Sequence, residues 1–325
     1  MILLRLLPVL FLSIVVTLLP SCRKSDDAKT VVLYSSVDSD VLRPIIDRFT
    51  AQTGIKVLIV GDTEATKTTG LVQRLIAEKE RPRADVWWSS EALGTVQLSR
   101  AGLLEPYTSA GNETEFSGGW PKDQRGKLGD WYGFALRARV KVTQADAPPP
   151  VDGDVGKIAV ANPRFGTTRS HLAHVLWSAG AEDYTNLLKA ARPAIRVCDG
   201  NAAVVRAVAQ GEARTGFTDY DDVLAGRRNG WKLHFEPSGP TIPNTVAIIR
   251  GGPNAAAARQ LFDFILSAET ERALAAGESK NIPLRPAVRA EFPELKVFAV
   301  EVVNWDEVAD RVEEALTIWD ETIGK

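Results

Sequence analysis

Short β-branched segments alternate with amphipathic helical patterns in the first third of the chain after position 29. Strands are predicted at 30–34, 55–60 and 84–88. A helical stripe follows the first strand, and Gly54 marks its end; its apolar residues are Val41, Leu42, Ile45, Ile46 and Phe49. Because such alternation builds a sheet covered by helices, we expect an α/β layered fold and not a helical bundle or a β-sandwich.

The same alternation resumes after a polar, glycine-rich stretch at 111–129 and an extended segment at 131–142. Further strands are expected near 155–161, 214–218 and 245–249, and further helices at 170–177, 201–210 and 305–323. Two α/β units joined by an extended segment indicate two lobes. Open α/β sheets bind ligands outside the carboxyl ends of their strands. Two facing lobes therefore predict a cleft between them that closes by a hinge motion.

The first 22 residues have the pattern of an export signal. A short basic start precedes the apolar run 6–19, which is too short to span a bilayer comfortably. The sequence Leu19-Pro20-Ser21-Cys22 resembles the lipobox of bacterial lipoproteins. We expect a signal peptide at 1–21, a lipid on Cys22 and a polar tether at 22–29, in a lipoprotein of the periplasm or cell surface. The alternative is a secretory signal with an incidental cysteine.

Composition excludes several classes of function. The formal net charge is −2 and no basic block is present, so nucleic acid is not an expected partner. With a lipid on Cys22, Cys198 would be the only remaining thiol, and we expect it to be a small buried residue. Neither a Gly-x-Ser-x-Gly nor a His-Glu-x-x-His motif occurs, which favours a binding protein over an enzyme.

Six segments, taken in order, carry a family resemblance. They lie at 32–36, 49–57, 84–88, 101–107, 208–212 and 257–267. Together they resemble the extracellular solute-binding proteins of ABC importers, in the branch of the periplasmic ferric-ion-binding proteins. The resemblance implies the two-lobed type II periplasmic-binding fold, with lobe 1 at 30–135 plus 241–289 and lobe 2 at 136–240 plus 290–325. It also implies a monomer that delivers iron to the transmembrane subunits of an ABC permease.

The resemblance further implies a metal site at four positions. The expected cargo is Fe³⁺ or Fe²⁺, and the ferric ion is a hard cation that prefers carboxylate and phenolate oxygens. The positions that match the ligands of the ferric binders are Asp38, Glu91, Tyr220 and Asp221. Asp221 stands where those proteins carry a second tyrosine, which leaves a divalent metal open. Asp38 and Glu91 also have an alternative role at helix N-termini.

Ferric binders complete the metal shell with a bound anion. The matching positions are Thr167 and Thr168 before a helix, Asn201 at the start of another, and Arg137 on the extended segment. We expect them to hold a carbonate or a phosphate-type anion, and simple helix capping is the alternative. Arg139, on the same segment, is an alternative to Arg137.

Several further residues have weaker interpretations. Asp62 and Glu64 follow a strand and are more often turn residues than ligands. His171 and His174 share a helical face, which favours a surface pair over a zinc site. The missing second tyrosine leaves open a small organic solute such as a phosphonate or thiamine, although the acidic cluster disfavours an anion.

Overall fold

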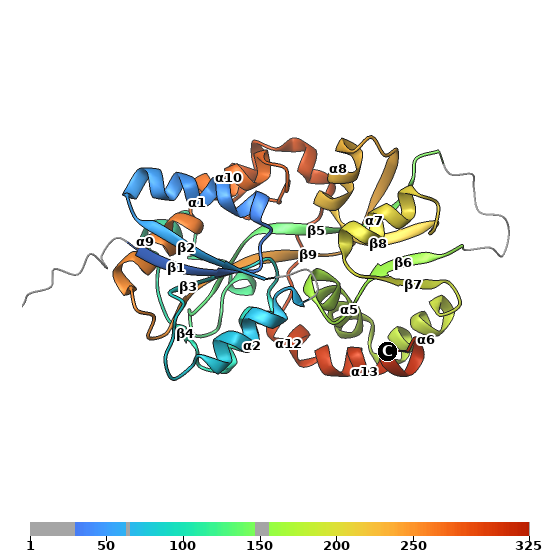
Figure 1. Ribbon diagram of the computed structural model, residues 1–325, viewed down its shortest axis with the longest axis horizontal. Helices are drawn as coiled ribbons and strands as arrows, with labels where there is room; N and C mark the ends of the chain where they lie inside the picture. The colour runs from blue at the N-terminus through green and yellow to red at the C-terminus, as the bar shows by residue number, and fades with distance from the viewer. Residues whose placement is uncertain (1–29, 63–65, 147–155, 325) are drawn as a thin grey trace, which may run out of the picture.

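The computed structural model describes residues 30–62, 66–146 and 156–324 (Figure 1). The predicted signal peptide, Cys22, the tether and Glu64 lie outside these ranges. Within them, no helix combines the length and the apolar character that crossing a membrane requires.

One nine-stranded sheet runs through the molecule in the order β2-β1-β3-β9-β5-β8-β6-β7, with β4 paired to β9. Its strands are β1 (Thr30–Ser35), β2 (Lys56–Gly61), β3 (Val86–Ser89), β4 (Leu104–Glu105), β5 (Tyr132–Gln144), β6 (Ile158–Ala161), β7 (Ile195–Cys198), β8 (Thr215–Asp219) and β9 (Leu233–Ile249). The α/β class predicted from the alternation is confirmed.

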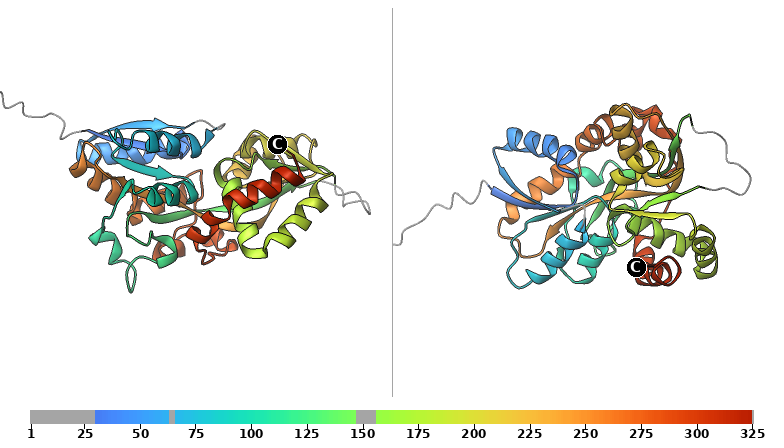
Figure 2. Two further views of the ribbon diagram at one scale, coloured as in Figure 1. Left: turned by 90° about the horizontal axis from the view of Figure 1, so that it is seen from below. Right: turned by 45° about the vertical axis from the view of Figure 1, so that its right-hand side comes forward.

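Helices cover both faces of the sheet (Figures 1 and 2). They are α1 (Ser39–Thr53), α2 (Thr69–Ala77), α3 (Leu93–Arg100), α4 (Ala110–Glu113), α5 (Gly166–Ala179), α6 (Ala181–Ala191), α7 (Asn201–Ala209), α8 (Tyr220–Arg228), α9 (Ala255–Ile265), α10 (Ala268–Ala276), α11 (Pro286–Ala290), α12 (Trp305–Asp310) and α13 (Val312–Thr322), with short 3₁₀ turns at Lys122–Gln124 and Pro293–Val297.

Two long strands connect the two halves of the molecule. β1 pairs in parallel with β2 and β3 in one half, and β6 pairs in parallel with β7 and β8 in the other. The antiparallel pair β5 and β9 contributes to both halves, because β9 also pairs with β3 and β5 also pairs with β8 (Figure 1). Among the described residues, β5 and β9 therefore connect the two halves along the middle of the sheet.

The register of β5 on β9 shifts twice, between Phe134 and Leu136 and between Ala138 and Val140. At the first shift Ala135 has a φ of 42°, which costs a non-glycine residue free energy. Asn244 and Asn281 donate to its carbonyl oxygen, and its N–H donates to the buried carboxylate of Glu271. These contacts hold the strained backbone in place at the middle of the connecting strand.

The core is divided by the sheet. In the first half, α1 and α9 pack against one face, while α2, α3 and α12 pack with Trp87 on the other. In the second half, α7 and α8 cover one face, and α5, α6 and α13 cover the other (Figure 2). Trp319 of α13 forms an apolar cluster with residues of α5 and α6. α12 contacts both α3 and α5, so the C-terminal segment links the two halves.

Three sequence expectations about elements need correction. The strand expected at 245–249 begins at Leu233, because its first part pairs with the second half of β5. The helix expected at 305–323 is interrupted at Arg311. The stretch 111–129, expected to be loop, contains most of α4 and a 3₁₀ turn.

Candidate functional site

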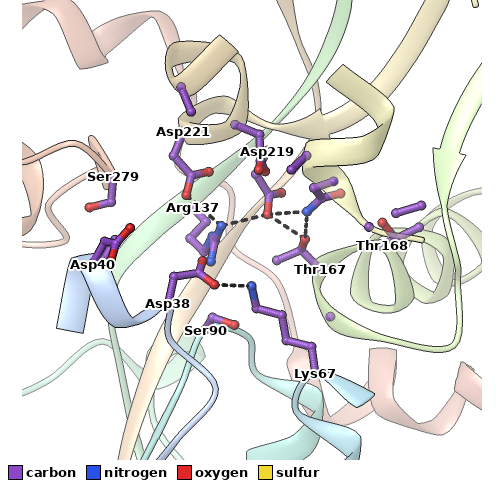
Figure 3. A pocket seen from close by; sticks show the side chains of 18 of the residues that line it. Asp38, Asp40, Lys67, Ser90, Arg137, Thr167, Thr168, Asp219, Asp221 and Ser279 are labelled. Atoms are coloured by element: carbon purple, nitrogen blue, oxygen red, sulfur yellow. Dashed lines mark hydrogen bonds and ion pairs between the residues drawn. The ribbon is translucent and has the colours of Figure 1, made fainter. Parts of the chain in front are cut away.

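A cavity of about 470 Å³ lies between the two halves of the sheet (Figure 3). One wall carries Asp38 and Ser90, which follow β1 and β3. The other carries Thr167 and Asn201, which follow β6 and β7, and Asp219 at the end of β8. These strands run parallel within each half, so their carboxyl ends deliver polar side chains to one place, as open α/β sheets do.

The first wall contains the ion pair of Asp38 and Lys67. Asp38 precedes α1 but makes no side-chain capping hydrogen bond, so its carboxylate is available to the cavity. Lys67 Nζ lies 2.7 Å from Asp38 Oδ1 (Figure 3). Burial would raise the pKa of Asp38, but the positive charges of Lys67 and Arg137 outweigh burial and lower it. Asp38 is therefore ionised at neutral pH.

The second wall carries three carboxylates from four consecutive residues. Asp219, Asp221 and Asp222 each offer an oxygen within 4.8 Å of the others, in the geometry of a potential metal-binding group. Burial raises the pKa of Asp221, and burial together with the charges of Asp221 and Asp219 raises that of Asp222 well above the usual range. Carboxylates this close repel one another unless a proton or a cation lies among them.

Arg137 supplies part of the compensating charge. Its Nη2 lies 2.9 Å from Asp221 Oδ2 and 3.1 Å from Asp219 Oδ2. Arg137 was predicted to hold an external anion, whereas the structure pairs it with two carboxylates of the protein. The side chain is buried and lies on β5, between the two walls.

Asp219 occupies the centre of the predicted anion site. Its Oδ2 accepts hydrogen bonds from Thr167 Oγ1 at 2.7 Å and from Asn201 Nδ2 at 2.9 Å. Its Oδ1 accepts from Arg139 Nη1 at 2.7 Å. Burial would raise the pKa of Asp219, but Arg137 and Arg139 lower it. Thr167 and Asn201 therefore face a carboxylate of the chain itself.

Local backbone geometry places these donors. Gly166 has a φ of 56°, a left-handed conformation that favours glycine. It turns the chain between β6 and the body of α5, directly before Thr167 and Thr168. Thr168 Oγ1 is buried and has no hydrogen-bond partner among the described residues, although Thr168 lines the cavity (Figure 3).

The structure does not bring Glu91 to the cavity. The Glu91 carboxylate is buried and accepts hydrogen bonds from the backbone N–H groups of Leu93 and Gly94 at the start of α3. It also accepts from Ser170 Oγ at 2.9 Å, which joins α3 to α5. The helix-terminus alternative describes Glu91 in this conformation, because its carboxylate accepts two N–H groups at the start of α3.

Tyr220 also points away from the carboxylates. Its ring packs against Phe235 and Phe298, with centroids 4.8 and 4.9 Å away. Burial raises the pKa of its phenol, which therefore keeps its proton at neutral pH. Of the four predicted metal positions, the structure places Asp38 and Asp221 at the cavity and leaves Glu91 and Tyr220 outside it.

The remaining predicted residues have structural roles. His174 is buried, and His171 Nδ1 lies 3.4 Å from Arg139 Nε, so the expected surface pair is wrong. Burial and Arg139 lower the pKa of His171 to about 3. Asp62 follows β2 and accepts from Leu71 N–H at the start of α2. Cys198 is free and half-buried.

The roles of Lys67, Asp219 and Asp222 were not predicted from the sequence. Asp219 and Asp222 flank the predicted positions Tyr220 and Asp221 in the sequence. The signal available for Asp219 was its place as the last residue of β8, where a parallel strand points its end at the cavity. Lys67 lies just before α2 and gave no local signal, since its partner Asp38 is 29 positions away in the sequence.

The fold and the cavity between its halves define a two-lobed solute-binding protein of the periplasmic-binding class. The profile described as bacterial extracellular solute-binding protein matches residues 30–277. The chain belongs to this family, as its resemblance predicted.

Individual relatives extend the comparison. The major ferric iron-binding protein of Neisseria meningitidis serogroup B is 23% identical over 300 residues, covering 86% of this chain and 85% of that protein. Iron-bound HitA from Pseudomonas aeruginosa superimposes with a TM-score of 0.77 at 21% identity, covering 90% of this chain and 99% of the other. A Trichodesmium protein in complex with iron and citrate gives 0.74 at 20% identity, with 91% and 100% covered. These two structures show that the fold is shared.

Proposed function

We propose that this protein captures iron in the cavity between its lobes and delivers it to the permease of an ABC importer. One observation carries the proposal: Asp219, Asp221 and Asp222 form a cluster of carboxylates facing the cavity. Oxygen donors of this kind suit a hard cation. Two relatives, the major ferric iron-binding protein and iron-bound HitA, support the same cargo.

Asp221 and Asp222 are the proposed ligands from the second wall, and Asp38 is the proposed ligand from the first. Asp221 is held by Arg137 and Asp38 by Lys67. An iron ion therefore competes with two cations of the protein for its own ligands. Closing the lobes on iron would replace these pairs with metal–oxygen bonds from both walls, which couples capture to closure.

The charge of the cavity supports a cation over an organic anion such as a phosphonate. Seven acidic and three basic side chains line it: Asp38, Asp40, Asp199, Asp219, Asp221, Asp222 and Glu278, with Lys67, Arg137 and Arg228. The excess of carboxylates attracts a metal ion and repels a free anion.

The remaining parts of the proposal come from the sequence. The proposed lobes are 30–135 plus 241–289 and 136–240 plus 290–325, although α12 in the last range packs against α3 of the first lobe. The strands β5 and β9 would act as the hinge. A lipid on Cys22 would hold the monomer at the membrane next to its permease. Mass spectrometry of the exported protein tests this anchor, since diacylglycerol adds a defined mass at Cys22.

Iron binding to the purified domain, residues 24–325, tests the cargo. We expect Fe³⁺ added as the citrate complex to be retained after gel filtration. Asp221→Asn and Asp222→Asn should each lower the affinity at least tenfold, since even outer-shell partners contribute about 10–100-fold to a metal site. Asp183→Asn, on the exposed face of α6, is the matched control.

Folded protein that retains neither Fe³⁺ nor Fe²⁺ would reject the proposal. Retention of Fe²⁺ alone, under anaerobic conditions, would keep the site and change the oxidation state of the cargo. Equal binding by wild type and both Asp→Asn variants would place the metal elsewhere.

A further inference from the structure

We infer that the Asp219 carboxylate is a built-in anion, which takes the place of the external anion at this metal site. The inference rests on the proposed function and deepens it, because it defines what the site requires besides iron. It concerns the group of donors formed by Thr167, Asn201, Arg137 and Arg139, which we call the anion cradle.

The cradle is already occupied in a specific geometry. Two neutral donors, Thr167 Oγ1 and Asn201 Nδ2, meet Asp219 Oδ2 at 2.7 and 2.9 Å. Arg137 reaches the same oxygen at 3.1 Å, and Arg139 reaches Oδ1 at 2.7 Å. Four donors around two oxygens satisfy a carboxylate in the way that they would satisfy a bound carbonate or phosphate.

Burial makes this occupation stable. Asp219 has no exposed surface and Arg139 is 1% exposed, and removing one partner of such a pair leaves an uncompensated buried charge. An external anion would have to displace a carboxylate that is covalently attached and surrounded by two guanidinium groups. The neighbouring carboxylates of Asp221 and Asp222 would also repel it.

The cradle retains the chemistry of an anion site. Thr168 Oγ1 and Arg139 Nη2 are buried polar atoms that find no partner among the described residues. These two atoms could still form hydrogen bonds, and they belong to residues beside or among the donors that already bind Asp219. Removing the Asp219 side chain would therefore leave a positively charged, donor-rich space at the cavity wall, lined by Thr167, Thr168 and Asn201.

The consequence is that iron binding by this protein needs no free anion. Where an external anion completes a site, anion and metal raise each other's affinity, and coupling between two ligands is typically about 5–150-fold. For the wild-type protein we expect the iron affinity to change less than about threefold between buffers with and without carbonate or phosphate, below that range.

The decisive experiment uses inorganic phosphate and iron-free protein, so that its result is independent of the cargo. Isothermal titration calorimetry should show no phosphate binding to wild type and binding to Asp219→Ala. Asp219→Ala combined with Thr167→Val should lose that binding, because it lacks a cradle donor. Asp183→Ala, on α6, controls for a general effect of removing a negative charge.

Phosphate binding to iron-free wild type that Thr167→Val abolishes would overturn the inference. An iron affinity of wild type that rises tenfold or more on adding carbonate or phosphate would overturn it as well. If Asp219→Ala does not fold, the phosphate titration of wild type and its Thr167→Val variant decides the question. Failure to bind iron would reject the proposed function and leave the phosphate result intact.

Discussion

The two walls of the cavity differ in how firmly their charged groups are held. On the second wall, Asp219 is fully buried and bonded to four side chains, and Arg139 is 1% exposed. On the first wall, Asp38 is half-buried and pairs with Lys67. The second wall is a preorganised network. The first wall has groups that can exchange partners at low cost when the lobes close.

The strongest test of this contrast removes the buried cation of the second wall. We expect Arg139→Met to lower the free energy of unfolding by about 3–5 kcal/mol, because it leaves Asp219 buried with less compensation. Urea denaturation of both proteins measures the change. Lys141→Met, on the same strand and paired with an exposed glutamate, should change stability little. Equal losses in the two variants would contradict the contrast.

The second test uses the pH dependence of stability. Because the pKa of Asp222 is raised in the folded state, the folded protein binds this proton more tightly than the unfolded chain. The resulting stability is present below the ordinary aspartate pKa and is lost as pH rises through the raised value. Urea unfolding of iron-free protein from pH 4 to 8 should therefore show wild type losing stability relative to Asp222→Asn. Parallel curves of unfolding free energy against pH would show that folding does not raise the pKa of Asp222.

A smaller effect is expected on the first wall. Lys67→Gln frees Asp38 from its cation, so iron should bind more tightly, by about two- to fivefold for a pair worth about 0.5–1 kcal/mol. Competition with a chelator of known affinity measures it. Lys67→Arg keeps the charge and should bind as wild type does. Weaker binding by Lys67→Gln would mean that Lys67 contacts the cargo and does not compete with it.

The smallest effect is expected at Tyr220. Because its ring packs between Phe235 and Phe298, Tyr220→Phe should leave the iron affinity unchanged. The iron-loaded wild type should show no phenolate-to-iron absorption band. Tyr184→Phe, a buried tyrosine on α6, is the spectroscopic control. A band that disappears only in Tyr220→Phe would show that Tyr220 turns toward the cavity on metal binding.

Much of the fold was readable from local patterns. The stripe from Val41 to Phe49 and the left-handed Gly54 define α1 and its end, because helix periodicity and a glycine C-cap act over a few residues. The length of β9 was not readable, since Leu233–Pro237 is a strand only through pairing with β5. Pairing partners distant in sequence leave no local periodicity.

The site divides in the same way. Local sequence patterns were enough to predict the α/β class, the family and the presence of acids and hydroxyls after the strands, because strand ends and helix starts are local features. Tertiary structure decided that Asp219 fills the anion cradle, that Tyr220 joins an aromatic cluster and that Glu91 bonds Ser170. Asp219 and Arg139 lie 80 positions apart. A side chain's choice of partner at such a distance depends on strand register and packing, which no local pattern encodes.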